Sequence, residues 1–182
     1  HEVIGVVTNP DKAVGRSQKL VSSPVKKMAL EHDIPVYQPQ KASSIEFAAF
    51  LETLKADLFI VAAYSEILKD NILSMPPKGC INVHASLLPK YRGAAPIQRA
   101  VMAGEKKTGV TIMSMAEELD AGDMLKIVET PIGEDMTSGE LFEVLAKLGG
   151  EALLETLKSS KLQMASCSGI NLPKSSTINT AG

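Results

Sequence analysis

The sequence is poor in the residues that mark disulfide-rich, zinc-binding and membrane-spanning proteins. Its 182 residues include two cysteines, no tryptophan and only 4% aromatic residues. Cys80 and Cys167 lie far apart, with neither a CxxC pair nor clustered histidines, which argues against a disulfide framework or a zinc site. No apolar run is long enough to cross a bilayer, and the opening residues do not resemble a secretory signal. We therefore expect a protein of a reducing, cytosol-like compartment.

Charge is nearly balanced overall but unevenly distributed. The formal net charge of −2 does not by itself indicate nucleic-acid binding. Residues 9–27 carry five basic side chains against one acidic one, and residues 78–107 carry six against one, whereas residues 115–155 carry eleven acids against two lysines. Two basic segments beside one site would attract an anionic ligand. Ordinary solvated surface is the commoner explanation of a single charged run and stays open.

The pattern of apolar residues predicts an α/β domain. Hydrophobic residues make up 45% of the chain, enough for one domain with an aliphatic core. Strands are predicted at 3–7, 34–37, 57–63, 80–84, 109–115 and 124–132, with helices over 24–31, 45–55, 96–103 and 138–158. Because strands and helices alternate, we expect a mostly parallel sheet, ending in an antiparallel hairpin formed by the last two strands.

Four local features complete this prediction. A long polar loop is expected between the first strand and residue 23. The continuous apolar run at 57–63 predicts a strand buried on both faces. Gly149 and Gly150 are expected to weaken the last helix. Beyond residue 158 the composition turns to Ser, Thr, Asn and Gly, so residues 1–158 are predicted to form the domain and 159–182 a linker or disordered tail.

Residues 80–89, with the sequence CINVHASLLP, form the stretch most indicative of chemistry. Side chains alternate along a strand, so Ile81 and Val83 face one side while Asn82 and His84 face the other. Polar side chains near the carboxyl end of a central strand lie where open α/β sheets bind their ligands. For a lone histidine, a buried ring bonded to a backbone carbonyl is the commoner role, and that alternative stays open.

A carboxylate near this pair would complete a recognisable chemical set. Asp120 lies in the connection between the two predicted hairpin strands, and that hairpin could pack beside the 80–84 strand. A carboxylate stabilises an imidazolium, the imidazole moves protons at neutral pH, and an amide N–H donates to a developing oxyanion. The sequence has no GxSxG or Cys–His motif for a covalent nucleophile. Asn82, His84 and Asp120 therefore favour direct attack of an external nucleophile on a bound acyl donor.

Several segments together closely resemble the 10-formyltetrahydrofolate-dependent formyltransferases. They are NVHASLLP at 82–89, KYRGAAPIQ at 90–98, TGVT at 108–111 and LDAGD at 119–123. The resemblance covers about residues 3–158. It implies a Rossmann-like formyltransferase domain, with a mostly parallel twisted sheet, an antiparallel hairpin and flanking helices. Such a domain belongs to the cytoplasm of a bacterium or to an organelle matrix or stroma.

The resemblance also implies roles for individual residues. Asn82, His84 and Asp120 match the family's catalytic trio. Four residues match the segment that lines the folate site: Ser86, Leu87, Leu88 and Pro89. Three basic residues fall on a loop that enters the acceptor region of tRNA: Lys12, Arg16 and Lys19. The implied co-substrate is 10-formyltetrahydrofolate as formyl donor, with no metal, no membrane partner and a monomer as the default state.

Within the family, AAPIQ at 94–98 and TIM at 111–113 resemble the members that formylate initiator methionyl-tRNA for translation initiation. Three alternatives stay open: another folate-dependent formyltransferase, a formyltetrahydrofolate hydrolase, and a non-catalytic folate-binding module. Two family features have no match in the sequence. They are a first strand with its helix before residue 1 and a basic C-terminal β-barrel domain after about residue 158. We therefore expect the catalytic domain of a longer enzyme, lacking the first strand.

Overall fold

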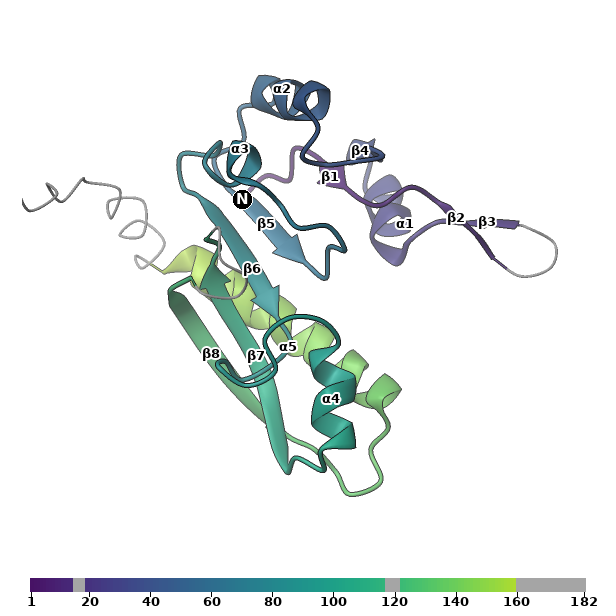
Figure 1. Ribbon diagram of the computed structural model, residues 1–182, viewed down its shortest axis with the longest axis vertical. Coiled ribbons are helices and arrows are strands. Elements are labelled where there is room, and N and C mark those ends of the chain that lie inside the picture. The colour runs from purple at the N-terminus through teal and green to yellow at the C-terminus, as the bar shows by residue number, and fades with distance from the viewer. Residues whose placement is uncertain (15–18, 117–121, 160–182) are drawn as a thin grey trace, which may run out of the picture.

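A four-stranded sheet is the centre of the fold. The computed structural model describes residues 1–14, 19–116 and 122–159. Four strands form the sheet in the order β5-β6-β7-β8: β5 (Phe59–Ala62), β6 (Cys80–His84), β7 (Lys107–Ser114) and β8 (Met124–Pro131). β5 and β6 are parallel, whereas β6–β7 and β7–β8 are antiparallel. The predicted hairpin is therefore present and pairs directly with β6 (Figure 1).

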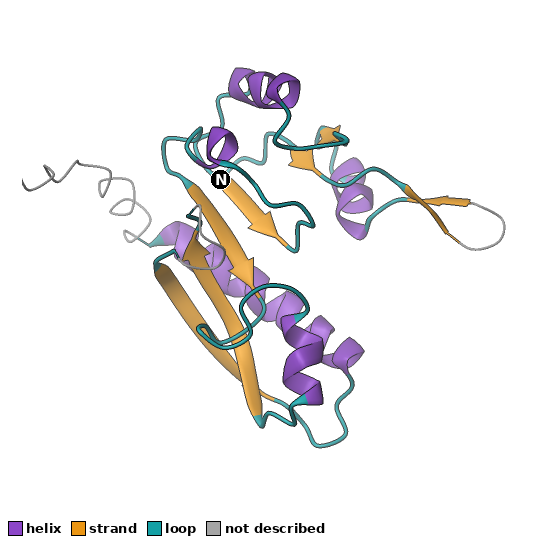
Figure 2. Ribbon diagram, in the orientation of Figure 1, coloured by secondary structure: helices purple, strands orange, loops and turns teal. Residues whose placement is uncertain are grey.

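The amino-terminal part forms two smaller sheets. β1 (Val6–Val7) pairs in parallel with β4 (Val36–Tyr37), and β2 (Lys12–Val14) pairs in antiparallel with β3 (Lys19–Val21). The pairs β1–β4 and β5–β6, whose strands are separated by helices, are parallel as expected. β6 and β7 are antiparallel although a helix at Pro96–Met102 lies between them, and the two hairpins supply the other antiparallel ladders. The loop predicted up to residue 23 was wrong in part, because residues 12–14 and 19–21 form a short hairpin that projects from the body of the protein (Figure 2).

Within the described part of the chain, five helices connect and cover these strands: α1 (Pro24–Glu31), α2 (Ile45–Thr53), α3 (Asp70–Leu73), α4 (Pro96–Met102) and α5 (Ser138–Lys158). Side-chain caps fix three of their starting points. Ser23 and Ser44 accept hydrogen bonds from the N–H groups three residues on. Thr137 and Glu140 form a complete capping box at the start of α5. The helix starts at residues 24, 45 and 138 confirm the sequence prediction. In each case the capping residues lie within one turn of the helix that they start.

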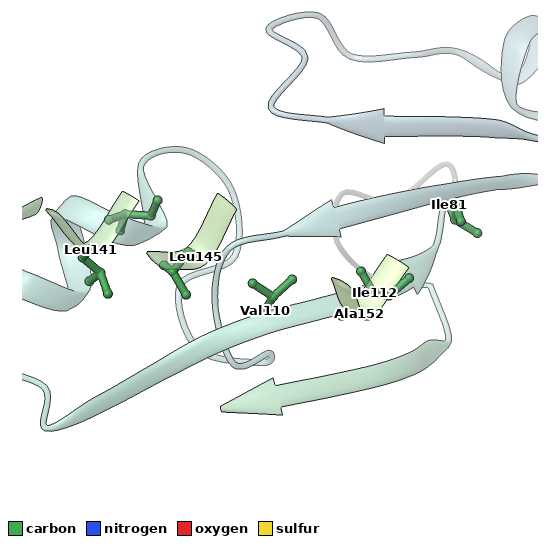
Figure 3. Close-up of a cluster of buried hydrophobic side chains, with 7 residues drawn as sticks. Ile81, Val110, Ile112, Leu141, Leu145 and Ala152 are labelled. Carbon is green, nitrogen blue, oxygen red and sulfur yellow. The ribbon is translucent and has the colours of Figure 1, made fainter. Parts of the chain in front are cut away.

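The main core lies between α5 and one face of the sheet. Ile81, Val110 and Ile112 from the strands meet Leu141, Leu145 and Ala152 from the helix (Figure 3). The glycine pair predicted to weaken α5 does not interrupt it. A Cβ at Gly149 would lie 3.0 Å from Val83 Cγ1, so the glycine permits a close approach of the helix to the sheet. None of the helices in the described ranges is long and apolar enough to cross a membrane.

The prediction that β5 is buried on both faces was wrong. Ile60 is 47% exposed and Ala62 is exposed, while Phe59 packs into a second cluster with α2 and α3. Ile60 pairs with Ile81 and Ala62 with Val83, so both belong to the face that carries α5. β5 is the edge strand of the sheet, and α5 packs mainly against β7 and β8. The helix therefore leaves the apolar residues of β5 uncovered on that face.

Cys80 is a buried thiol. It is 4% exposed, its Sγ lies 3.4 Å from Leu73 O, and burial raises the pKa of the Cys80 thiol to about 12. Because the thiolate is the reactive form and only about one thiol in 10⁴ is ionised four pH units below its pKa, iodoacetamide at pH 8 should leave Cys80 unmodified in the native protein. Peptide mass spectrometry of native and urea-unfolded samples measures this. Rapid labelling of the native protein would contradict it.

Candidate active site

Asn82 and His84 lie on the same face of β6, opposite the α5 side. Their neighbours Ile81 and Val83 pack into the α5 core, as the alternation predicted. On the adjacent strand Asn82 is paired with Met113 and His84 with Thr111. Asn82 is partly buried and His84 is 7% exposed. The strand therefore presents an amide and an imidazole two residues apart, in surroundings largely shielded from water.

A main-chain oxygen orients the imidazole. His84 Nε2 lies 3.1 Å from Tyr91 O, in the loop between β6 and α4. A carbonyl oxygen can only accept, so Nε2 carries the proton when this hydrogen bond is made, and the lone pair of the neutral ring lies on Nδ1. Tyr91 adopts a left-handed backbone conformation with φ of 58°, which is uncommon for a residue with a side chain. The sequence left a backbone carbonyl open as a partner of the ring but did not identify Tyr91 as the residue that supplies it.

The loop that carries Tyr91 is held against β7 by two buried hydroxyls. Thr111 Oγ1 donates to Ser86 O at 2.7 Å and accepts from Leu88 N at 3.3 Å. Ser86 Oγ in turn donates to Lys90 O at 2.7 Å. Thr111 and Ser86 are both 0% exposed. The loop therefore folds back across the sheet at the carboxyl end of β6, next to His84 (Figure 1).

The four residues predicted to line a folate site differ in what they expose. Ser86 is buried and its hydroxyl is used within the loop, and Leu88 is 8% exposed. Leu87 is partly buried and packs over Gly109, where an added Cβ would lie 2.6 Å from Leu87 Cδ2. Pro89 is exposed. In this structure Leu87 and Pro89 have the surface that a ligand could contact, while Ser86 and Leu88 shape the loop.

Asp120 lies outside the described residues, but both ends of its connection are described. Met115 N donates to Cys80 O at 2.8 Å, and Ser114 and Asp123 are hydrogen-bonded to each other. The connection thus begins and ends beside the start of β6, whereas His84 is at the other end of that strand. Gly122 fits there because a Cβ would lie 1.8 Å from Ser114 O.

Two of the three predicted tRNA-binding residues, Lys12 and Lys19, belong to the β2–β3 hairpin. Lys12 is exposed on β2, Lys19 begins β3, and Arg16 lies outside the described residues. The base of the hairpin is tied to the body by Asp11. Its carboxylate accepts from Lys26 Nζ at 2.8 Å, Gln38 Nε2 at 2.9 Å and Ser22 Oγ at 3.1 Å. Lys26 and Gln38 hold the pKa of the Asp11 carboxyl below its usual value.

Two surface depressions among the described residues include neither Asn82 nor His84. The larger, of about 520 Å³, is lined by Ser43 and residues 67–71, and the other lies beside α2. In the same part of the chain, no group of three or more His, Cys, Asp or Glu side chains could hold a metal ion.

Comparison with known proteins identifies the family. The Formyl transferase family model matches residues 1–157. Methionyl-tRNA formyltransferase of Protochlamydia amoebophila (strain UWE25) is 54% identical over 157 residues, which are 86% of this chain and 49% of the relative. The protein of that name from Clostridioides difficile (strain 630) is 52% identical over 158 residues, or 87% of this chain and 51% of the relative. The chain spans about half the length of these relatives.

Solved structures share the fold at lower identity. Phosphoribosylglycinamide formyltransferase from Bacillus halodurans superimposes with a TM-score of 0.71 at 24% identity, covering 84% of this chain and 78% of that one. A formyltetrahydrofolate deformylase from Pseudomonas syringae pv. tomato gives 0.72 at 22% identity, covering 89% and 52%. These likenesses confirm the predicted fold class. With the family model matching nearly all of residues 1–158, the chain belongs to the formyl transferase family.

Proposed function

We propose that this chain transfers a formyl group from 10-formyltetrahydrofolate to the amino group of initiator methionyl-tRNA. The observation that carries the proposal is the placement of Asn82 and His84 side by side on β6, within a chain 52–54% identical to proteins named methionyl-tRNA formyltransferase. That identity favours this acceptor over glycinamide ribonucleotide or water. The solved structures whose names include those activities are 17–26% identical to this chain.

The proposed chemistry uses three side chains. The methionyl amino nitrogen attacks the formyl carbon, which forms the new C–N bond, and the carbonyl oxygen gains negative charge. The amide of Asn82 donates a hydrogen bond to that oxygen. His84 accepts the proton from the attacking amine and returns it to N10 of the folate as the bond between N10 and the formyl carbon breaks. Asp120 stabilises the positively charged imidazole ring between these two steps.

The reach of the chain supports a role for Asp120. Asp123 is hydrogen-bonded to Ser114, which is paired with Ile81 on β6. Asp120 is three positions from Asp123 and Ile81 is three positions from His84, so either segment can span about 10 Å when extended. This length of chain is sufficient to connect Asp123 with the face that holds Asn82 and His84.

The proposed donor site lies along the loop after β6. Leu87 and Pro89 offer apolar surface to the pterin, while Ser86 and Leu88 hold the loop in place. This proposal narrows the sequence prediction, in which all four residues line the folate site, to two residues that contact the ligand and two that hold the loop. Because Leu88 is 8% exposed, a charged residue there would disturb the fold as well as binding, so a change at Leu87 is the cleaner probe.

A single-turnover assay tests the function. The chain is mixed in excess with labelled 10-formyltetrahydrofolate and initiator methionyl-tRNA, and formylmethionyl-tRNA is followed by rapid quench. We expect label to move to the aminoacyl end of the tRNA. Parallel reactions with glycinamide ribonucleotide and with no acceptor measure the alternative transferase and hydrolase activities. Folate binding without label transfer to tRNA would contradict the proposal.

Arg16→Ala should weaken tRNA binding and formylation while leaving folate binding unchanged. The β2–β3 hairpin projects away from the loop at residues 86–89, and phosphate contacts add to affinity through the release of counterions (Figure 1). Each neutralised phosphate adds roughly −0.9 to the slope of log K against log salt on duplex nucleic acid, so the variant should lose about one such unit. Titration of labelled methionyl-tRNA over a salt series measures the slope.

The control for this titration is Lys41→Ala, because Lys41 is an exposed lysine outside the hairpin. If Arg16→Ala and the parent bind tRNA equally at every salt concentration, the hairpin does not contact the acceptor.

A further inference from the structure

Three successive carbonyl oxygens in the loop after β6 are each held by a different side chain. Lys90 O accepts from Ser86 Oγ at 2.7 Å, and Arg92 O accepts from Arg99 Nη1 at 2.9 Å. Between them, Tyr91 O lies 3.1 Å from His84 Nε2. Because the oxygens on both sides are bonded, the peptide groups that set the direction of the Tyr91 carbonyl have little freedom to rotate.

Glu105 holds the side chains of the same loop. Its Oε1 accepts from Tyr91 Oη at 2.8 Å and lies 2.9 Å from Lys90 Nζ. Glu105 lies three residues after the end of α4, and its own N–H donates to Ala100 O at 3.1 Å, so the residue is anchored to the end of that helix. The bonds to Lys90 and Tyr91 hold the pKa of the Glu105 carboxyl below its usual value.

The tyrosine ring is held on a second side as well. The Arg99 guanidinium lies over the Tyr91 ring, 5.2 Å from its centroid. Arg99 belongs to α4, and Glu105 follows the same helix, so one short helix holds the ring and the hydroxyl of Tyr91 together. This fixation matters because Tyr91 has a φ of 58°, a conformation that costs a residue with a side chain free energy and persists only when its surroundings enforce it.

We propose that Glu105 is a positioning residue for His84. By holding Tyr91 and Lys90, it keeps the Tyr91 carbonyl against Nε2, so Nε2 carries a proton and the ring is held in one orientation. The catalytic meaning of this arrangement rests on the proposed function, in which His84 takes the proton from the attacking amine. The tautomer itself is a property of the free protein and can be measured without any turnover.

Nuclear magnetic resonance of the ¹⁵N-histidine-labelled chain tests the proposal. The three histidines are assigned with His1→Gln and His32→Gln variants, and long-range ¹H–¹⁵N spectra show which ring nitrogen of His84 is protonated. In the parent we expect the proton on Nε2. Glu105→Ala should lower the share of that tautomer. Tyr91→Phe, which removes one hydroxyl and keeps the ring under Arg99, should have a smaller effect in the same direction.

The matched control compares the same substitution at two glutamates, Glu105→Gln and Glu129→Gln. Glu105→Gln should change the His84 spectrum in the same direction as Glu105→Ala. Like Glu105, Glu129 is a glutamate paired with a lysine, Lys107 at 2.9 Å, but it lies on β8. We expect no change in the His84 spectrum for Glu129→Gln. A parent with the proton on Nδ1, or a Glu105→Ala variant with the parental ¹⁵N pattern, overturns the proposal.

Kinetics separate positioning from mere folding. Glu105→Ala should lower kcat by less than the roughly 10²-fold expected for loss of an acid–base group, leave the KM for folate unchanged and shift the pH profile of kcat/KM. An unshifted pH profile would contradict a positioning role. A parent chain without formyl transfer would contradict the proposed function while leaving the tautomer result intact, so the two failures are distinguishable.

Discussion

Replacing His84 with alanine should lower the single-turnover rate of formyl transfer by about 100-fold or more. The imidazole is the group at the end of β6 that can both accept and return a proton near neutral pH, and Tyr91 O holds it in one orientation. Asn82→Ala should cause a loss of similar size, because one donor to a developing oxyanion is typically worth about 10²-fold or more. Rapid quench with the natural acceptor measures both rates.

The matched control for the histidine is His32→Ala. His32 follows α1 and is exposed, so the same change there should leave transfer at the parental rate. Removal of the His84 ring also leaves the Tyr91 carbonyl without this partner. Because the ring is only 7% exposed, the lost hydrogen bond lies largely away from water and should cost about 1–3 kcal/mol of stability. Urea denaturation and folate titration therefore accompany the rate measurement. Parental rates in folded His84→Ala or Asn82→Ala would remove that residue from the catalytic group.

The helix starts and the catalytic strand could be predicted from the sequence because their signals are local. Ser23, Ser44 and Thr137 with Glu140 satisfy N–H groups within one turn, so four neighbouring residues contain the whole interaction. The alternation of residues 81–84 likewise fixes which side chains share a face once the strand forms. Both predictions depend on no contact with a distant part of the chain.

The remaining features depend on contacts that no short pattern encodes. The acceptor for His84 Nε2 is a main-chain oxygen, which every residue type possesses, and its direction follows from the left-handed conformation of Tyr91. Glu105 was counted as a lone acid in a basic segment, yet it binds residues 14 and 15 positions earlier. The β2–β3 hairpin pairs two three-residue strands, too short for an alternation of apolar residues to stand out.

For β5, the local sequence predicted the strand correctly but not its burial, which depends on a distant helix. The apolar run at 57–63 correctly predicted a strand, but burial depends on which helix covers which face. α5 lies along β7 and β8, so Ile60 at the sheet edge stays 47% exposed. A run of apolar residues therefore indicates a strand and does not by itself determine how deeply it is buried.

Thr111→Val exchanges one hydroxyl for one methyl group, yet it should destabilise the protein strongly. Thr111 Oγ1 bonds both Ser86 O and Leu88 N, and Thr111 is 0% exposed. Valine keeps the shape and leaves a buried carbonyl and a buried N–H unpaired, each at a cost of about 1–3 kcal/mol. Urea denaturation of parent and variant measures the change in the free energy of unfolding.

Thr156→Val provides the matched comparison. Thr156 is 3% exposed, and its hydroxyl donates to Ala152 O at 2.8 Å within α5. That carbonyl also accepts the N–H four residues on in the helix, so the variant leaves no main-chain group unpaired and should lose only about 0.5–1.5 kcal/mol. We further expect Thr111→Val, but not Thr156→Val, to weaken folate binding, because only Thr111 holds the loop of Leu87 and Pro89. Equal losses of stability in the two variants would show that the Thr111 bonds do not hold this loop in place.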